Sequence, residues 1–181
     1  MTKKKPNVLI TGASSGIGEA LARHYAITGA GTLFISGRNR ERLETVKTAC
    51  ERYNVKVYAE VMDVTDRQNT AAWIKKCEEI APLNIVYANA GVATLEETPE
   101  NIYNTFNTNV IGVLNTLIPA VEIFKNRRDK HKTLVITSSI AGYHGLPSCP
   151  SYSASKACVK AYGEALRSEL RQFSIQVSVI C

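Results

Sequence analysis

A tyrosine and a lysine stand four residues apart, at Tyr152 and Lys156. If this segment opens a helix, both side chains lie on one face and can contact each other. A neighbouring ammonium and a helix N-terminus both favour the phenolate form, which suits a tyrosine to proton transfer. Of the eight tyrosines in the chain, only Tyr152 is followed by a lysine at this spacing. The pair alone also fits an ordinary surface contact, so the rest of the sequence must decide.

A serine thirteen residues before Tyr152 extends this chemistry. Ser139 follows an apolar run that is typical of a strand. A hydroxyl at the carboxyl end of a strand could hold a substrate carbonyl oxygen beside the tyrosine. Consecutive serines such as Ser138 and Ser139 are also common in turns, which is the simpler interpretation of this pair.

The first apolar run leads into a glycine-rich turn that contains Gly12, Gly16 and Gly18. Glycines at such a turn let the backbone approach a phosphate, and the following helix N-terminus offers N–H donors and a positive dipole. The spacing G-x-x-x-G-x-G differs from the common dinucleotide fingerprint G-x-G-x-x-G. The pattern therefore favours a dinucleotide site, and a tight turn without a ligand is the alternative.

The end of the second predicted strand bears on the choice of cofactor. A carboxylate at this position would bind the ribose hydroxyls of NAD, and none is present. Instead Gly37 leaves space and Arg38 supplies a guanidinium, which suits a 2′-phosphate through charge-assisted hydrogen bonds. The sequence therefore predicts NADP in preference to NAD, and an exposed arginine that opens the next helix is the alternative for Arg38.

Apolar runs and helical stretches alternate along the whole chain. The predicted strands are Val8–Ile10, Thr32–Ser36, Val55–Met62, Leu83–Ala88, Thr133–Ser138 and Ile175–Ile180. The predicted helices are Ile17–Thr28, Arg40–Tyr53, Thr65–Ile80, Pro99–Asn126 and Tyr152–Gln172. Asp66 near the start of the third helix and Thr98 ahead of the fourth are N-terminal signals. Most of the strands lack polar alternation, as expected where helices cover both faces of a sheet. We therefore predict an α/β fold with a Rossmann-type doubly wound parallel sheet, formed by a single NAD(P)-binding domain over residues 1–181.

Composition and charge argue against several other classes of protein. Hydrophobic residues make up 45% and charged residues 21% of the chain, which indicates a folded globular domain. The net charge of +6 is scattered apart from Lys3–Lys5 and Lys125–Lys132, which we interpret as solvated segments. Five cysteines without a C-x-x-C pair and three isolated histidines predict neither a disulfide framework nor a metal site. We expect a cytoplasmic protein that binds neither nucleic acid nor a membrane.

These motifs together resemble the short-chain dehydrogenase/reductase family, in its compact single-domain branch. The motifs that carry the resemblance are Thr11–Gly18, Ala88–Gly91, Asn109–Gly112, Ser139 and the pair Tyr152/Lys156. Each motif is modest alone, but all occur in the order and approximate spacing of the family, over essentially the whole chain. The resemblance implies a parallel dinucleotide-binding fold and oxidoreductase activity.

The resemblance also implies a role for each matching position. The positions that match the cofactor site, together with Arg38, are Gly12, Ser14, Ser15, Gly16, Ile17, Gly18, Asp63, Val64, Asn89, Ala90, Gly91, Tyr152 and Lys156. The positions that match the catalytic set are Asn109, Ser139, Tyr152 and Lys156. By this resemblance Ser139 and Tyr152 contact the substrate, Lys156 also holds the nicotinamide ribose, and Asn109 holds a water in the proton relay.

Two departures from the family pattern stand out. Ala88 replaces the first asparagine of an Asn-Asn-Ala-Gly motif, and we expect little effect. The chain stops at Cys181, directly after the sixth predicted strand. By resemblance, the substrate lid and the last strand would follow there. We therefore expect the sequence to be part of a longer protein, incomplete at its C-terminus, whose activity as residues 1–181 alone is doubtful.

The leading functional prediction is an NADP-dependent oxidoreductase that interconverts a carbonyl and a secondary alcohol by hydride transfer, with tyrosine as general acid/base. A dinucleotide sensor or scaffold on the same fold is the alternative, although it would not need a proton-transfer group. A methyltransferase also begins with a glycine-rich turn but leaves the Tyr152/Lys156 pair unexplained. The sequence does not specify which carbonyl or alcohol is the small-molecule substrate.

The last helix predicts self-association. It carries Val159, Tyr162, Leu166 and Leu170 at helical spacing, with Ala157, Ala161 and Ala165 beside them. Packing against the sheet explains part of this apolar set in a monomer. Small residues on the outer face would let a second helix approach closely, and the family resemblance implies that such helices pair across a two-fold axis. We therefore predict a homodimer or homotetramer.

Overall fold

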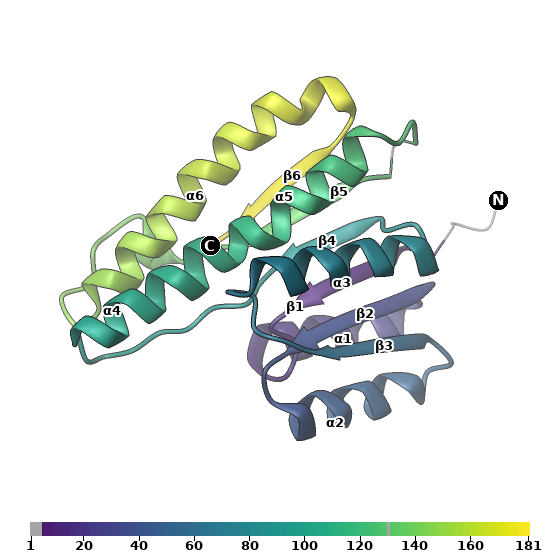
Figure 1. The fold of residues 1–181 in the computed structure, drawn as a ribbon, viewed down its shortest axis with the longest axis horizontal. Coiled ribbons are helices and arrows are strands. Elements are labelled where there is room, and N and C mark those ends of the chain that lie inside the picture. Colours follow the sequence, from purple (N-terminus) through teal and green to yellow (C-terminus); the bar gives the residue numbers. More distant parts are fainter. Residues whose placement is uncertain (1–4, 130) are drawn as a thin grey trace.

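The structure is a computed structural model that describes residues 5–129 and 131–181, in which strands and helices alternate along the chain (Figure 1). The strands are β1 (Asn7–Thr11), β2 (Thr32–Gly37), β3 (Lys56–Val61), β4 (Ile85–Ala88), β5 (Thr133–Thr137) and β6 (Gln176–Ile180). The α-helices are α1 (Gly16–Thr28), α2 (Arg40–Glu51), α3 (Arg67–Ile80), α4 (Pro99–Phe106), α5 (Gly112–Lys125) and α6 (Pro150–Leu170). Of the two predicted basic clusters, Lys3, Lys4 and Lys130 lie outside the described residues.

The six strands form one parallel sheet in the order β3-β2-β1-β4-β5-β6. Successive strands move outward from β1 in one direction and, from β4 onward, in the other. The loops that leave the carboxyl ends of β1 and β4 therefore diverge, which opens a crevice at that edge of the sheet. The predicted Rossmann-type doubly wound parallel sheet is confirmed.

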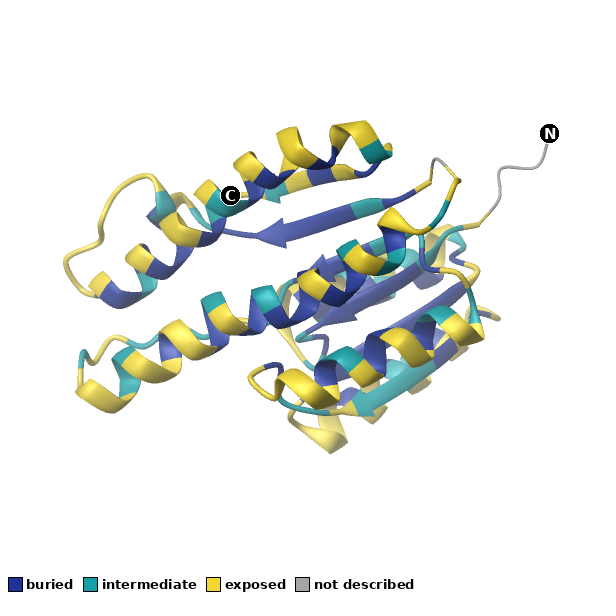
Figure 2. Cartoon of the chain, turned by 45° about the horizontal axis from the view of Figure 1, so that its top comes forward, coloured by how far each residue is buried: buried dark blue, intermediate teal, exposed yellow. Residues whose placement is uncertain are grey.

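Two apolar cores lie on the two faces of this sheet. Helices α3, α5 and α6 cover one face and contribute Trp73, Leu117 and Leu166 to its core. Helices α1 and α2 cover the other face and contribute Ala22 and Val46. Figure 2 shows buried residues along one side of the helices and exposed residues along the other. Within the described parts of the chain, no helix has the length and apolar character needed to cross a membrane.

Local capping residues set the starts of three helices, and the sequence indicated two of them, at α3 and α4. Asp66 accepts a hydrogen bond from the backbone N–H of Asn69 at the start of α3. Thr98 caps α4 in the same way, with Pro99 at the first helical position. Asn39 caps α2. Each side chain satisfies a backbone donor that the first helical turn would otherwise leave unpaired.

The helical run after β4 contains an irregularity that the sequence did not predict. The expected single helix Pro99–Asn126 is α4, then a π-helical turn at Asn107–Ile111, then α5. π-turns of this kind are often found at functional sites, because they shift side chains relative to a regular helix. This one contains Asn109, and it is followed by Gly112, where an added Cβ would lie 2.5 Å from Cγ2 of Val64.

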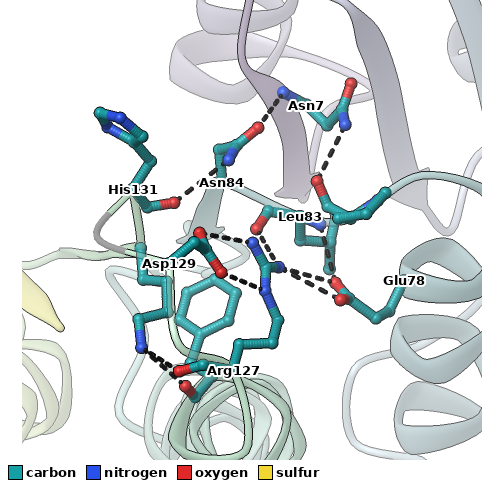
Figure 3. Close-up of polar contacts among 10 residues, drawn as sticks. Asn7, Glu78, Leu83, Asn84, Arg127, Asp129 and His131 are labelled. Carbon is teal, nitrogen blue, oxygen red and sulfur yellow. Dashed lines mark hydrogen bonds and ion pairs between the residues drawn. The ribbon is translucent and has the colours of Figure 1, made fainter. Parts of the chain in front are cut away.

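The amino edge of the sheet is closed by a polar network centred on Arg127, just after α5 (Figure 3). Its guanidinium donates to both carboxylate oxygens of Glu78 at 3.1 and 3.2 Å, to the carbonyl of Leu83 at 2.6 Å and to Asp129 at 2.8 Å. Glu78 also accepts from the backbone N–H of Leu83 at 2.7 Å. The network joins the end of α3, the approach to β4 and the end of α5.

A buried lysine completes this edge. Lys132 is 2% exposed, and its ammonium donates to the carbonyl oxygens of Phe124 at 3.0 Å and Arg127 at 2.8 Å. Those carbonyls lie at the C-terminus of α5, where the last backbone acceptors lack helical partners and the helix dipole is negative. Lys132 therefore caps α5 with a charge of the favourable sign.

Candidate active site

A cleft of about 430 Å³ lies at the carboxyl edge of the sheet. It is lined by Gly12, Ser14, Ser15, Gly16, Ile17, Gly37, Arg38, Asn39, Arg42, Met62, Asp63, Val64, Asn89, Ala90, Gly91, Val92, Ala93, Thr108, Thr137, Ser138, Tyr152 and Lys156. Most of the site residues expected from the sequence are in this set. Gly18, Asn109 and Ser139 are not, and each has a different position relative to the cleft.

The glycine turn has the geometry of a phosphate cradle. Gly12 has φ +68°, and an added Cβ would lie 2.7 Å from Cα of Ala90. Gly16 has φ +56° with no neighbouring atom within 4 Å of an added Cβ, so its backbone borders open space. Gly18 lies behind the turn, where a Cβ would overlap the carbonyl oxygen of Gly12. The first N–H groups of α1 therefore lie beside the cleft, in a turn whose close contacts and positive φ angles require glycine.

Two arginines line the cleft where β2 ends. A guanidinium nitrogen of Arg38 lies 3.7 Å from a carboxylate oxygen of Asp63, and both side chains are partly exposed. Arg42 lines the same end, and its backbone N–H is held by Asn39 at 2.9 Å. No acidic residue occurs between the end of β2 and the start of α2. Arg42 was not predicted from the sequence, although its place four residues after Arg38, in the first turn of α2, was a usable signal.

Asn89 ties together three strands below the cleft. Its amide nitrogen donates to the carbonyl of Thr11 at 3.0 Å, and its amide oxygen accepts from the hydroxyl of Thr137 at 3.1 Å. The hydroxyl of Thr11 accepts from the backbone N–H groups of Asn89 and Ala90. Asn89 therefore fixes the carboxyl ends of β1, β4 and β5 relative to one another. The adjacent Ala88 is buried in the core of one sheet face.

Tyr152 and Lys156 lie in the first turns of α6 and share a face, as their spacing predicted. The Lys156 ammonium is 5.7 Å from the centre of the Tyr152 ring. It donates to the carbonyl of Thr137 at 2.8 Å and is 4% exposed. Burial lowers the pKa of Lys156 to about 8. The cleft thus holds an amine that can change its protonation state near neutral pH, beside a phenol.

The two consecutive serines after β5 have different surroundings. The hydroxyl of Ser138 donates to the carbonyl of Lys156 at 2.9 Å and is buried, so it holds α6 against β5. Ser139 is half-buried, and its hydroxyl accepts from the backbone N–H of Ala141 at 3.2 Å, at the start of a short 3₁₀ turn. The Ser139 hydroxyl retains its proton for donation to a ligand.

Asn109 lies behind the cleft rather than on its wall. Its amide oxygen accepts from the backbone N–H of Val92 at 2.7 Å, and its amide nitrogen donates to the Val92 carbonyl at 2.9 Å and the Ser155 hydroxyl at 3.0 Å. A Cβ at Gly91 would lie 3.1 Å from the Asn109 amide oxygen and 3.3 Å from the Lys156 ammonium. Asn109 is therefore close to Lys156, but its side chain is fully engaged by the protein.

Known proteins identify this arrangement. A family model described as short chain dehydrogenase matches residues 6–181. The chain belongs to the short-chain dehydrogenase/reductase family. A 33% identical relative is an uncharacterized oxidoreductase of Mycobacterium tuberculosis, and the match covers 99% of this chain and 72% of that protein. An uncharacterized oxidoreductase of Myxococcus xanthus is 35% identical, over 95% of this chain and 69% of that protein.

Solved structures of short-chain dehydrogenases share the fold. A short-chain type dehydrogenase/reductase from Mycobacterium marinum superposes with a TM-score of 0.88 at 27% identity, over 96% of this chain and 72% of that one. A short-chain dehydrogenase/reductase from Burkholderia phymatum in complex with NAD has the same TM-score at 25% identity, over 99% of this chain and 65% of that one. The protein is therefore a short-chain dehydrogenase/reductase enzyme of a family that binds nicotinamide dinucleotides.

Two further residues that support the site were not singled out from the sequence. Asn115 on α5 donates to the carbonyls of Val64 at 2.9 Å and Thr65 at 3.3 Å, and so holds the segment after β3. Glu97, in the loop before α4, binds Ser151 at the start of α6. Among the described residues, no group of three or more His, Cys, Asp or Glu side chains could hold a metal ion.

Proposed function

We propose that this enzyme is an NADP-dependent oxidoreductase that interconverts a carbonyl and a secondary alcohol. The observation that carries the proposal is the convergence on one cleft of a glycine phosphate cradle, a pair of arginines and the Tyr152/Lys156 pair. Each belongs to a different element, so the fold and not sequence proximity brings them together. When bound, the nicotinamide supplies or accepts the hydride.

The lining residues fit a phosphorylated dinucleotide from end to end. The glycine turn and Ser14, Ser15 and Ile17 would hold the pyrophosphate at the N-terminus of α1. Arg38 and Arg42 would hold the 2′-phosphate by charge-assisted hydrogen bonds. The remaining proposed cofactor contacts are Asp63 and Val64 on the adenine side, and Asn89, Ala90 and Gly91 beside the nicotinamide ribose.

The other residues would move and hold protons. Tyr152 would give its phenolic proton to the substrate oxygen in reduction and remove a proton from the alcohol in oxidation. Ser139 would donate a hydrogen bond to the same oxygen and orient it. Lys156, when protonated, would place a positive charge beside the Tyr152 ring and hold the ribose hydroxyls. Asn109 would hold the Gly91–Val92 backbone in place next to Lys156. We also predict that Asn109 holds a water molecule that links the proton transfer to solvent.

We also propose that two copies pair through α4, α5 and α6. Large apolar side chains are exposed along the α4–α5 run, and small ones along α6. These exposed residues are Tyr103, Phe106, Ile111 and Ile118 on the first run, and Ala157, Ala161 and Ala165 on α6. Of the predicted apolar set on α6, Val159, Leu166 and Leu170 are buried and Tyr162 is partly buried, so the alanines remain available for a second helix. A concentration-independent monomer in sedimentation experiments would contradict the pairing.

The function is tested by measuring NADPH oxidation and NADP⁺ reduction with a panel of aldehydes, ketones and secondary alcohols. The proposal predicts turnover with at least one carbonyl–alcohol pair, and faster turnover with NADPH than with NADH. NADPH binding without turnover across the panel would instead support a dinucleotide sensor. Equal turnover with the two cofactors would contradict the NADP assignment while leaving the oxidoreductase assignment in place.

A further inference from the structure

The first turn of α6 is capped by a carboxylate from a distant part of the chain. One carboxylate oxygen of Glu97 accepts from the backbone N–H of Ser151 at 3.1 Å and from the Ser151 hydroxyl at 2.8 Å. Cys149, the residue at the N-cap position of α6, makes no side-chain capping bond. Glu97 therefore takes over the role that a local Ser, Thr, Asp or Asn has at other helices of this protein.

This cap has the charge that the helix start favours. The N-terminus of α6 has unpaired backbone N–H groups and the positive end of the helix dipole, and a carboxylate is the group that stabilises both. Ser151 is 5% exposed, so the contact lies in partly desolvated surroundings where hydrogen bonds to a charged group are strong. Tyr152 is the next residue, and its position depends directly on this turn.

The loop that carries Glu97 is fixed to the same helix at a second point. Asn109 holds both backbone polar groups of Val92 and also binds the hydroxyl of Ser155. Ser155 in turn donates to the carbonyl of Tyr152 at 2.7 Å. The loop from Val92 to Glu97 is thus connected to α6 on both sides of Tyr152, at residues 151 and 155.

We propose that Glu97 is a positioning residue, which acts through Ser151 to set the Tyr152 hydroxyl against the substrate oxygen and to hold the Val92–Ala93 wall of the cleft. This inference rests on the proposed function, because it assigns Tyr152 the proton-transfer role. It predicts that the loop before α4 and the start of α6 form one unit whose geometry determines kcat.

The test compares Glu97→Ala and Glu97→Gln with a matched control, Glu96→Ala. Glu96 is exposed and contributes only its backbone carbonyl to a bond with Asn101, so its side chain has no equivalent role. With saturating NADPH, Glu97→Ala should lower kcat roughly tenfold to hundredfold, since small misplacements of catalytic groups have effects of this size. Glu97→Gln should recover most of kcat because its amide oxygen can accept both bonds, and the dissociation constant for NADPH should stay near that of the parent.

Ser151→Ala decides whether Glu97 acts through Ser151. Ser151→Ala alone should lower kcat less than Glu97→Ala does, because the backbone N–H of residue 151 can still bind Glu97. The double variant Glu97→Ala/Ser151→Ala should have nearly the same kcat as Glu97→Ala. Additive losses, parent-like kcat in Glu97→Ala, or an equal loss in Glu96→Ala would each overturn the proposal.

Hydrogen exchange gives a second readout that needs no turnover. Glu97→Ala should speed amide exchange in the first turn of α6, and Glu96→Ala should not. A parent protein that turns over no carbonyl would contradict the proposed function, and faster exchange in Glu97→Ala would still show the capping role. Unchanged exchange in Glu97→Ala would overturn the positioning role whatever the activity.

Discussion

Two lysines are buried in the part of the chain that the structure describes, and they lie at opposite edges of the sheet in different surroundings. Lys132 at the amino edge donates to two carbonyls at the negative end of α5, beside the Arg127 network. Lys156 at the carboxyl edge donates to one carbonyl, lies beside a phenol ring and lines the open cleft. Burial lowers the pKa of Lys156 to about 8. The same residue type is thus satisfied by the fold at one edge and left available to a ligand at the other.

This difference indicates how the molecule divides its polar groups between stability and function. At the amino edge, charged and amide side chains bind one another and backbone groups, which closes the ends of β1, β4 and β5 (Figure 3). At the carboxyl edge, Arg38, Tyr152 and Lys156 border open space. Buried polar groups that lack full partners destabilise a fold, and such groups cluster where a ligand completes them.

The largest expected effect is on kcat, and it comes from replacing the Tyr152 phenol at the carboxyl edge of the sheet. Tyr152→Phe keeps the ring and removes the transferable proton, so kcat should fall about 10²- to 10⁴-fold. The affinity for NADPH and the free energy of unfolding should change little. Tyr53→Phe, on the exposed turn after α2, is the matched control and should behave like the parent. A Tyr152→Phe enzyme with near-parent kcat would show that the proton comes from another group.

Lys156→Met should lower turnover, by less than Tyr152→Phe does, and stabilise the cofactor-free protein. The pKa is lowered from its ordinary 10.5 to about 8 by burial, so the charged lysine destabilises the fold at neutral pH. After allowance for the lost bond to Thr137, the variant should be more stable by about 2 kcal/mol at pH 7.

The lowered pKa of Lys156 also predicts how the free energy of unfolding of the parent depends on pH. Between pH 8 and pH 10.5 the unfolded chain binds the lysine proton more tightly than the folded one, so parent stability should rise with pH in this window. The advantage of Lys156→Met should therefore shrink over the same range in urea unfolding. A variant less stable than the parent at pH 7 would contradict the account.

Lys132→Met is the corresponding substitution at the amino edge of the sheet. It removes the ammonium donor from the carbonyls of Phe124 and Arg127, and with it a favourable charge from the end of α5. The free energy of unfolding should fall by about 1–3 kcal/mol, while kcat remains that of the parent. Urea unfolding and a steady-state assay below the unfolding transition measure both quantities. Loss of kcat without loss of stability would show that the two edges are not separate in function.

The smallest effect concerns cofactor choice. Arg38→Ala should remove a preference for NADPH over NADH of roughly tenfold to hundredfold, since a hydrogen bond to a charged group has this strength. Arg40→Ala is the control, because Arg40 opens α2 without lining the cleft. NADH affinity should hardly change in either variant. A preference that survives in Arg38→Ala but not in Arg42→Ala would transfer the role to the arginine that sequence analysis missed.

Local signals made most of the fold predictable. Runs rich in apolar and β-branched residues predicted all six parallel strands, and caps such as Asp66 and Thr98 predicted two helix starts. The start of α6 was placed two residues late, at Tyr152 instead of Pro150. Its cap is Glu97, fifty-four residues before Ser151 in sequence, which no local pattern could indicate. The π-turn at Asn107–Ile111 was also missed, because no local residue pattern specifies it.

The parts of the candidate site that could be predicted are those whose residues follow a fixed spacing in the sequence. The glycine turn and the Tyr152/Lys156 pair are such cases, and the structure places them on one cleft. What a side chain contacts after folding was not predictable. The engagement of Asn109 by Val92 and Ser155, and the ion pair between Arg38 and Asp63, arise only when distant strands and helices meet.

Calorimetric titration of NADPH into the parent, Lys156→Met and Lys132→Met tests the central claim most directly. The account predicts that Lys132→Met binds NADPH as the parent does, whereas Lys156→Met binds roughly tenfold to hundredfold more weakly. Equal affinities in all three proteins, or a loss confined to Lys132→Met, would contradict the assignment of the carboxyl edge to the cofactor and of the amino edge to stability.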